Sequence, residues 1–254
     1  MKIDPVVFTV GPFAIRWYGI LIASAILIGT FLALREVEKQ GINADHFLNT
    51  LIVAIPAAFI GARLYYVVFN WDYYRQFPKE IPATWHGGMA IHGALLASLL
   101  VGYFMLKKYK INFWQSTDIV APSIVLGQAI GRWGNFFNQE AYGYPVDKAQ
   151  VPWAMFIDGA YRHPTFFYES LWNVGVFLFL LWIRRKKQLK CGDVFLSYVI
   201  LYSVGRFFIE GLRTDSLMLT STLRAAQVVS VMAILAAGGL IYYRHKRNEA
   251  PAGE

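Results

Sequence analysis

The sequence predicts an all-α integral membrane protein with about seven transmembrane helices, and three observations support this fold class. Hydrophobic residues make up 56% of the 254 residues and charged residues only 16%, against roughly 25% in a soluble domain. Several apolar runs reach the ~20 residues that a bilayer core requires. The basic residues lie in short clusters between these runs, so the net charge of +8 indicates membrane topology and not a nucleic-acid partner.

Seven hydrophobic segments account for the predicted helices, and we expect them to form a single transmembrane domain over residues 1–254. Polar residues such as Gln128 and Arg132 interrupt the fourth segment. We keep it because, without it, the basic clusters 107–110 and 184–190 would face opposite sides of the membrane. The predicted segments are residues 17–34, 47–69, 88–106, 118–137, 165–183, 194–213 and 223–243.

The distribution of Lys and Arg predicts an outer N-terminus and a cytoplasmic C-terminus. With this orientation, thirteen of the 24 Lys and Arg residues lie in inner loops and the tail, and six lie in outer segments, as the positive-inside rule requires. Two long outer-face connecting segments, 70–87 and 138–164, are rich in aromatic residues, proline and glycine. They form either a cap or lateral gate, or simple interfacial connectors.

The remaining five arginines lie within the spans or at their ends, where a charged residue costs roughly 2.5–3.5 kcal/mol on insertion scales. The direction of each span places all five in the outer half of the membrane, together with Tyr18, His92 and Glu169. The sequence therefore predicts a polar cavity in the outer half. The five are Arg63, Arg132, Arg206, Arg213 and Arg224.

These arginines outnumber the carboxylates that we expect near them, which are Glu140, Glu169 and Glu210. Arg206 and Glu210 stand four residues apart on one helical face and should pair. The surplus positive charge indicates an anionic ligand, and the planar fork of arginine suits phosphate. We expect the phosphate of a lipid from the outer leaflet. A structural salt-bridge network is the main alternative, and an anion pathway is the third.

Segment 131–140 combines Arg132, Asn135 and Asn138 with several glycines, which is unusual within a span. Glycines allow two helices to approach closely or a helix to break. Backbone that breaks at membrane depth is tolerated where it lines a polar cavity. We therefore expect this segment to be a helix end that lines the cavity.

Segment 86–93 is the second candidate, because glycines flank His92 and give backbone and ligand access to it. A desolvated imidazole stays neutral, which suits a general base, and a structural role is the alternative. The chain has no His, Cys and Asp cluster with metal-ligand spacing, so we expect no metal or other cofactor. The single cysteine, Cys191, excludes a disulfide within the chain.

Seven motifs, in order along nearly the whole chain, resemble those of the bacterial prolipoprotein diacylglyceryl transferases. Ala94 departs from the pattern, because that family often has a second glycine there, and we expect only a slightly narrower cavity. The motifs are Arg16-Trp17-Tyr18-Gly19, Gly61-Ala62-Arg63-Leu64, Gly87-Gly88-Met89-Ala90-Ile91-His92-Gly93, Gly131-Arg132-x-Gly134-Asn135-x-x-Asn138-x-Glu140-x-x-Gly143, His163-Pro164-Thr165-x-x-Tyr168-Glu169, Tyr202-x-x-Gly205-Arg206-Phe207-x-x-Glu210-x-x-Arg213-Thr214-Asp215 and Arg224-x-x-Gln227-x-x-Ser230.

The resemblance implies an enzyme that transfers the diacylglyceryl group of phosphatidylglycerol to the lipobox cysteine of a prolipoprotein. The products are a thioether and glycerol-1-phosphate. The reaction would take place at the outer face of the bacterial cytoplasmic (inner) membrane, with membrane lipids and the precursor's signal peptide as partners.

The resemblance also implies roles for individual residues. His92 would deprotonate the thiol, Arg132 would bind the lipid phosphate, and Arg206 would stabilise the leaving phosphate; these three form the catalytic set. Whether Arg63, Arg213 and Arg224 are functional or structural stays open. The expected phosphatidylglycerol-binding residues are Arg132, Asn135, Asn138, Glu140, Gly143 and Tyr18, and the supporting residues are Tyr202, Glu210, Arg63, Arg213 and Glu169.

Two other classes of membrane protein compete with this interpretation. An anion or lipid transporter would carry polar residues through both leaflets, whereas the inner halves of these spans are mostly apolar, with Asp118 as the exception. Another phospholipid enzyme or an intramembrane protease is the second class. The chain has neither the aspartate-rich repeat of a CDP-alcohol phosphotransferase nor the serine setting or paired span aspartates of a protease.

Overall fold

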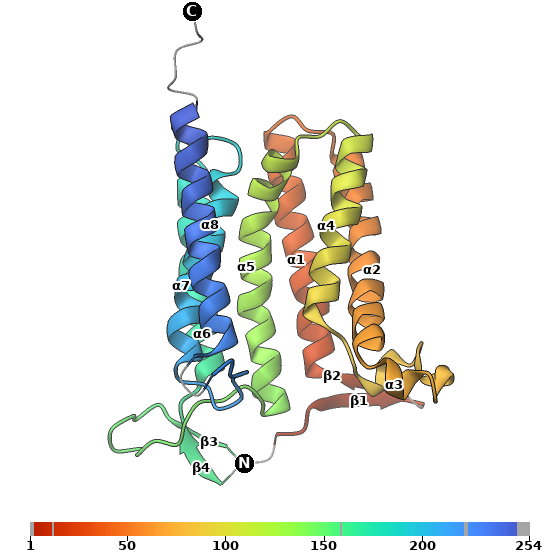
Figure 1. Ribbon diagram of the computed structural model, residues 1–254, viewed down its shortest axis with the longest axis vertical. Helices are drawn as coiled ribbons and strands as arrows, with labels where there is room; N and C mark the ends of the chain where they lie inside the picture. Colours follow the sequence, from red (N-terminus) through yellow and green to blue (C-terminus); the bar gives the residue numbers. More distant parts are fainter. Residues whose placement is uncertain (1–2, 12, 158, 221–222, 248–254) are drawn as a thin grey trace, which may run out of the picture. The chain divides into compact units, whose positions relative to one another are not determined.

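The computed structural model describes residues 3–11, 13–157, 159–220 and 223–247. This part of the chain is mainly helical, with eight α-helices and two short β-hairpins (Figure 1). It divides into two compact units. Unit 1 comprises residues 1–32 and 117–254, and unit 2 comprises residues 33–116.

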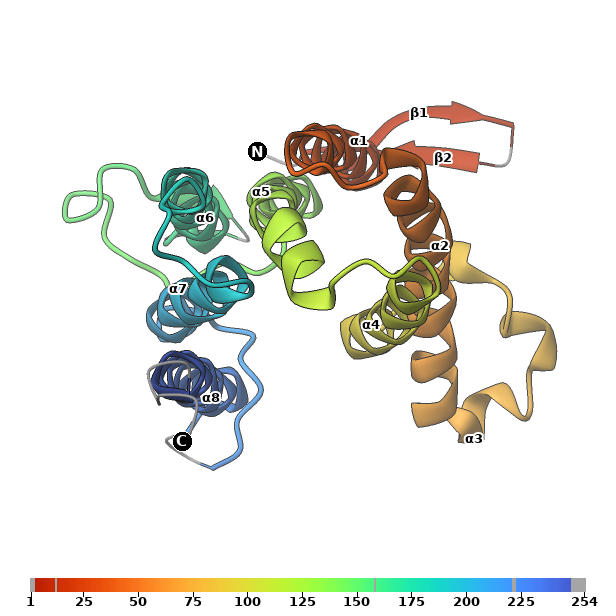
Figure 2. The same cartoon turned by 90° about the horizontal axis from the view of Figure 1, so that it is seen from above.

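Unit 2 is built on helices α2 (Ala44–Phe69) and α4 (Ile91–Lys108), which lie side by side (Figure 2). Gly61 and Gly93 face each other at their crossing, where a Cβ on either residue would collide with the opposite backbone. This close approach is why glycine stands at both positions. The backbone N–H of Ala90 donates to the carbonyl of Ala62 at 3.0 Å and fixes the start of α4.

The segment between α2 and α4 forms a connector of short helices. It contains α3 (Trp71–Tyr74) and the 3₁₀ helices η1 (Pro78–Glu80) and η2 (Thr84–His86). Gly87 and Gly88 follow, with φ of +87° and +77°, a region that favours glycine. Residues 70–90, which we call the connector, thus turn back onto the end of α2.

Unit 1 contains most of α1 (Trp17–Lys39) and of α5 (Phe113–Asn138), together with α6 (Thr165–Ile183), α7 (Asp193–Glu210) and α8 (Ala225–Arg247). Helices α6, α7 and α8 lie side by side in both views (Figures 1 and 2). An apolar core lies between α5, α6 and α7 and includes Val125, Val176, Leu180 and Val194. These residues recur at helical spacing, so each helix buries one face.

Asp118, the polar exception in the predicted inner halves, holds the beginning of α7. Its carboxylate accepts the backbone N–H of Gly192 at 2.5 Å and that of Phe195 at 2.8 Å. The first N–H groups of a helix have no partner within the helix, and a carboxylate satisfies them. Asp118 is therefore explained by its bonds to the first N–H groups of α7, and it does not require a polar pathway through the inner half of the membrane.

Two antiparallel hairpins are an addition to the predicted all-α fold. Strands β1 (Val6–Val10) and β2 (Phe13–Arg16) precede α1, and β3 (Met155–Ile157) pairs with β4 (Ala160–Arg162) in the segment between α5 and α6. Residues 142–146 continue the second hairpin, because Val146 N–H donates to Tyr161 O at 2.8 Å. Tyr144 N–H donates to Leu212 O at 3.0 Å and attaches this layer to the end of α7.

Each of the seven predicted segments coincides with one long helix. Among the described residues, five helices are long and apolar enough to cross a membrane: α1, α2, α4, α6 and α8. Helices α5 and α7 are outside this set, and α7 carries three charged residues, Asp193, Arg206 and Glu210, along its 18 residues. The protein is therefore a helical membrane protein, whereas the count of seven spans, their orientation and the single transmembrane domain stay predictions.

Candidate functional site

Glu169 of α6 connects two arginines from two other helices of unit 1. Its side chain is only 3% exposed, because it stands on the same buried face of α6 as the core residues. One carboxylate oxygen, Oε1, lies 2.5 Å from Nη2 of Arg132 on α5. The other, Oε2, lies 3.5 Å from Nη1 of Arg206 on α7. One buried carboxylate thus sets the separation of the two guanidinium groups.

Glu210, at the end of α7, is the second buried carboxylate of this cluster. Its Oε2 atom lies 2.5 Å from Nη2 of Arg206 and 3.9 Å from Nε of Arg213, which confirms the predicted pairing four residues apart. The guanidinium of Arg224 donates to the backbone carbonyl of Glu210 and to the Tyr144 hydroxyl at 2.8 Å. Tyr144 is a partner that the sequence analysis did not assign.

Asp215 changes the predicted charge count. It accepts two hydrogen bonds from Arg213, from Nε at 2.9 Å and from Nη2 at 2.6 Å, and this bond holds the pKa of the Asp215 carboxyl below its usual range. Asp215 is a carboxylate that the predicted count did not include, and it reduces the expected surplus of positive charge in unit 1. Glu140 accepts hydrogen bonds from amides, those of Asn135 and Asn138.

Exposure distinguishes the cations of the cluster from its anions. The side chains of Arg132 and Arg206 are 21% and 20% exposed, whereas those of Glu169 and Glu210 are 3% exposed. The two arginine side chains are therefore partly accessible, whereas the two carboxylates are buried. An anion can approach the arginines, whose guanidinium groups suit phosphate.

The end of α5 brings the predicted amides to Glu140. Asn135 and Asn138 donate to its Oε1 atom at 3.0 and 3.1 Å, and Arg132 Nη1 donates to Asn135 Oδ1 at 3.4 Å. The helix ends at Asn138, and Gln139 then has φ of +53°. The prediction of a helix end in this segment is confirmed. Asn135 joins Arg132 to Glu140, while Asn138 supports Glu140 only.

Two glycines of the motifs are required for close packing. The ring of Tyr18 lies against Gly134 and leaves no room for a Cβ, which brings Tyr18 beside the α5 motif. A Cβ on Gly143 would lie 2.7 Å from His163 Cβ and 2.9 Å from Leu212 O. Gly143 therefore acts in this structure by letting segment 142–146 pack between two backbones.

Two further contacts differ from the expectations. Among the described residues Tyr202 makes no hydrogen bond to Arg206, and its ring packs 5.9 Å from that of Tyr198, so its predicted orienting role has no supporting contact. Tyr168, which received no role, accepts a hydrogen bond from Trp153 Nε1 at 2.8 Å and contacts His163 Nδ1 at 3.1 Å. This trio attaches the 138–164 segment to the start of α6.

Arg63 belongs to unit 2, and its contacts there are structural. Its guanidinium has five N–H donors, and all of them meet backbone carbonyls of the connector. The acceptors are the carbonyls of Ile81 (2.8 Å, from Nε), Gly87 and Gly88 (2.6 and 2.9 Å, from Nη1), and Glu80 and Ala83 (2.6 and 3.3 Å, from Nη2). The sequence left open whether Arg63 is functional or structural, and in this structure its contacts hold the connector.

His92 also lies in unit 2, at the second residue of α4. It is exposed, and its ring stands 5.9 Å from that of Tyr65. Its role as a base stays a prediction. In the part of the chain that the structure describes, no group of three His, Cys, Asp or Glu residues is placed to hold a metal ion.

Comparisons with known proteins agree with the resemblance. A family model described as prolipoprotein diacylglyceryl transferase matches residues 5–243. Curated relatives bear the name phosphatidylglycerol–prolipoprotein diacylglyceryl transferase. One from Bacillus licheniformis is 51% identical over 252 residues, covering 95% of this chain and 93% of the relative. One from Geobacillus kaustophilus is 49% identical over 259 residues, covering 98% and 96%.

Proposed function

The chain belongs to the prolipoprotein diacylglyceryl transferase family, and on this basis we propose that it is a phosphatidylglycerol–prolipoprotein diacylglyceryl transferase. It transfers the diacylglyceryl group of phosphatidylglycerol to the lipobox cysteine of a prolipoprotein and releases glycerol-1-phosphate. The observation that carries the proposed site is the pair Arg132 and Arg206, which share the buried carboxylate of Glu169 while their own side chains stay partly exposed.

The reaction makes two demands on the protein. The thiolate of the substrate cysteine attacks the glyceryl carbon that carries the phosphate, because the thiolate and not the thiol is the nucleophile. A C–S bond forms and the C–O bond to the phosphate breaks, while the thiol proton passes to a base. The leaving phosphate changes from a diester with one negative charge to a monoester with up to two. Charge therefore develops on the phosphate oxygens in the transition state.

Arg132 and Arg206 meet the demand for charge stabilisation. Donors that are already oriented stabilise developing charge without reorganisation at the moment of reaction. Glu169 orients both guanidinium groups, and Glu210 holds Arg206 from the other side at 2.5 Å. We assign the bound lipid phosphate to Arg132 and the leaving phosphate to Arg206. The hydrogen bonds from Arg132 to Asn135 and from Asn135 to Glu140 hold the Arg132 guanidinium in place.

His92 is our candidate for the base that takes the thiol proton. It stands among the glycines at the start of α4, where the exposed ring is open to a substrate. An imidazole can accept a proton near physiological pH. The other imidazole of segment 86–93, that of His86, pairs with Glu80 at 2.7 Å. That His92 and the arginine cluster act on the same substrate is part of this proposal.

We propose the bacterial cytoplasmic (inner) membrane as the location, with the N-terminus outside and the arginine cluster toward the outer face. The basic clusters 107–110 and 184–190 support this orientation through the positive-inside rule. Phosphatidylglycerol and the signal peptide with its lipobox cysteine are the substrates. The segments 70–87 and 138–164 then lie at the outer face, where both substrates arrive.

A reconstituted assay tests the proposed function. Purified protein in vesicles is given phosphatidylglycerol and a lipobox peptide, and thioether product and glycerol phosphate are measured together. We expect equal amounts of the two products, and none with a peptide whose cysteine is replaced by serine. Release of neither product would overturn the proposal, and lipid movement between leaflets without either product would favour the transporter alternative.

A further inference from the structure

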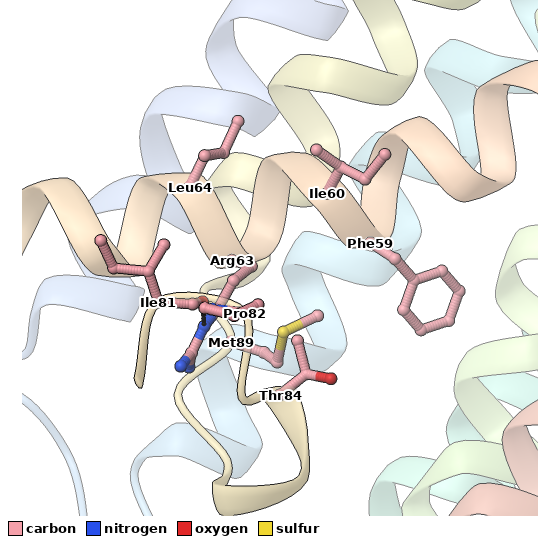
Figure 3. A pocket seen from close by; sticks show the side chains of 8 residues that line it. All are labelled: Phe59, Ile60, Arg63, Leu64, Ile81, Pro82, Thr84 and Met89. Atoms are coloured by element: carbon pink, nitrogen blue, oxygen red, sulfur yellow. Dashed lines mark hydrogen bonds between the residues drawn. The ribbon is translucent and has the colours of Figure 1, made fainter. Parts of the chain in front are cut away.

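Unit 2 contains a cavity of about 350 Å³ between α2 and the connector, within the ~300–1,000 Å³ of ligand pockets. Figure 3 shows Arg63 extending from α2 toward the connector residues that close the cavity. The apolar lining consists of Phe59, Ile60 and Leu64 from α2 and of Ile81, Pro82 and Met89 from the connector.

The polar groups around this cavity leave little to bind a polar ligand. Only Arg63 and Thr84 contribute polar side chains to its lining. Every N–H of Arg63 already meets a carbonyl of the connector. A water molecule in a cavity needs two to four polar partners, and Thr84 alone offers fewer. The cavity is therefore suited to an apolar occupant.

The α2 side of the cavity is continuous with the surface that faces lipid. Helix α2 is apolar enough to cross a membrane, and Phe59, Ile60 and Leu64 are 50%, 61% and 54% exposed. In a bilayer these side chains contact acyl chains, so an acyl chain can enter the cavity laterally. A peptide would bring an N–H and a C=O per residue that find no partner there, whereas an acyl chain brings none.

The connector is held in place before any ligand binds. Arg63 joins five of its carbonyls, and Gly88 lies so close that a Cβ would stand 2.6 Å from Arg63 Nη1. The bond from Ala90 N–H to Ala62 O, 3.0 Å long, fixes the end of the connector on α2. A preformed site loses less conformational entropy on binding, which favours specific occupancy over transient contact with bulk lipid.

We propose that this cavity binds one acyl chain of the donor phospholipid. Met89 lines the cavity and stands three residues before His92, so a bound chain would bring the glyceryl end of the lipid toward the beginning of α4. This inference rests on the proposed function and adds to it a site that selects the donor by its chain. The position of the chain also restrains the glyceryl carbon that the thiolate attacks.

Photolabelling tests the cavity without requiring turnover. Phosphatidylglycerol with a diazirine on one acyl chain is added at low abundance to phosphatidylcholine vesicles that contain the protein and no peptide. We expect labels mainly within residues 59–64 and 81–89. Ile60→Trp fills the cavity and should reduce labelling about tenfold, which corresponds to the loss of roughly two buried methylene groups. Ile52→Trp is the matched control, because Ile52 is 57% exposed on α2 outside the cavity.

Two further arms decide what fills the cavity. The same diazirine chain on phosphatidylcholine should label residues 59–64 and 81–89 much less; equal labelling would show that bulk lipid fills the cavity and would overturn the donor assignment. A precursor peptide with a photoreactive apolar residue that labels these positions would also overturn it. If Ile60→Trp lowers the thermal midpoint, Met89→Trp replaces it as the filled variant, and unchanged labelling in both contradicts the proposal.

The outcome for the cavity is distinguishable from the outcome for the proposed function. If transfer to the lipobox peptide occurs and labelling of the cavity fails, only the acyl-chain site is wrong. If labelling succeeds and transfer fails, the cavity is a phospholipid site and the proposed transferase activity is wrong.

Discussion

Arg63 in unit 2 and Arg132 in unit 1 are both arginines on long helices that were predicted as membrane spans, and their partners are of opposite kinds. Arg63 is 6% exposed and gives its five donors to backbone carbonyls. Arg132 pairs with the carboxylate of Glu169 at 2.5 Å and is 21% exposed. An arginine whose donors all meet carbonyls has none left for a ligand. Among the described residues Arg132 contacts Glu169 and Asn135, so some of its five N–H donors remain for a ligand.

Arg206→Ala should give the largest effect, because it removes a donor aimed at the leaving phosphate. We expect kcat/KM to fall about 100- to 1,000-fold, the range for loss of one oxyanion donor. Arg206→Lys should recover little, because lysine lacks the planar fork. Turnover is measured beside the thermal midpoint, with Arg75→Ala, at an exposed surface pair, as control. Near-normal turnover in a folded Arg206→Ala protein would remove Arg206 from the phosphate.

Arg63→Ala should act on stability instead. It leaves five carbonyls of the connector without their donor, and we expect a loss of about 3 kcal/mol in the free energy of unfolding. Inhibition by glycerol-1-phosphate reports phosphate binding, and its constant should be unchanged in Arg63→Ala but weakened in Arg132→Ala. If Arg63→Ala keeps its thermal midpoint and loses glycerol phosphate binding, Arg63 binds phosphate as Arg132 does, and the contrast between the two arginines is wrong.

His92→Gln tests whether unit 2 also takes part in the chemistry. Loss of a general base lowers kcat by about 100-fold or more, and we expect this fall without a change in thermal midpoint. His86→Gln is the matched control, since His86 lies six residues earlier on the connector and pairs with Glu80 at 2.7 Å. Substantial turnover by His92→Gln would mean that another group, such as the phosphate itself, takes the thiol proton.

Asp215→Asn should give the smallest effect, a change in thermal midpoint that depends on pH. Arg213 lowers the pKa of Asp215 in the folded protein, so this pair stabilises the fold at pH values above the unfolded pKa of about 4. The contribution is lost as the pH falls through the lowered folded pKa. Asp215→Asn should therefore reduce the thermal midpoint slightly at pH 6 and less at pH 3. An equal reduction at both pH values would contradict this account.

The sequence by itself determined the positions of the long helices and the partners that lie one turn apart. The apolar runs place six of the segments, because twenty apolar residues leave little choice but a buried or lipid-facing helix. The basic clusters on either side place the fourth segment, which polar residues interrupt. The pair Arg206 and Glu210 follows from helical spacing alone. The helix end at Asn138 was also predictable, since glycines and amides in a span indicate a break.

Only the tertiary structure decided which arginines pair with a common carboxylate and which give all their donors to backbone carbonyls. Glu169 forms ion pairs with arginines 37 residues away on either side in sequence, and Arg63 finds its acceptors 17 to 25 residues away. No local pattern predicts these partners, because they depend on how closely backbones approach at residues such as Gly61 and Gly143. Sequence periodicity acts over one or two helical turns. Whether a buried arginine serves a ligand or its own fold is decided by contacts between segments that lie far apart in the chain.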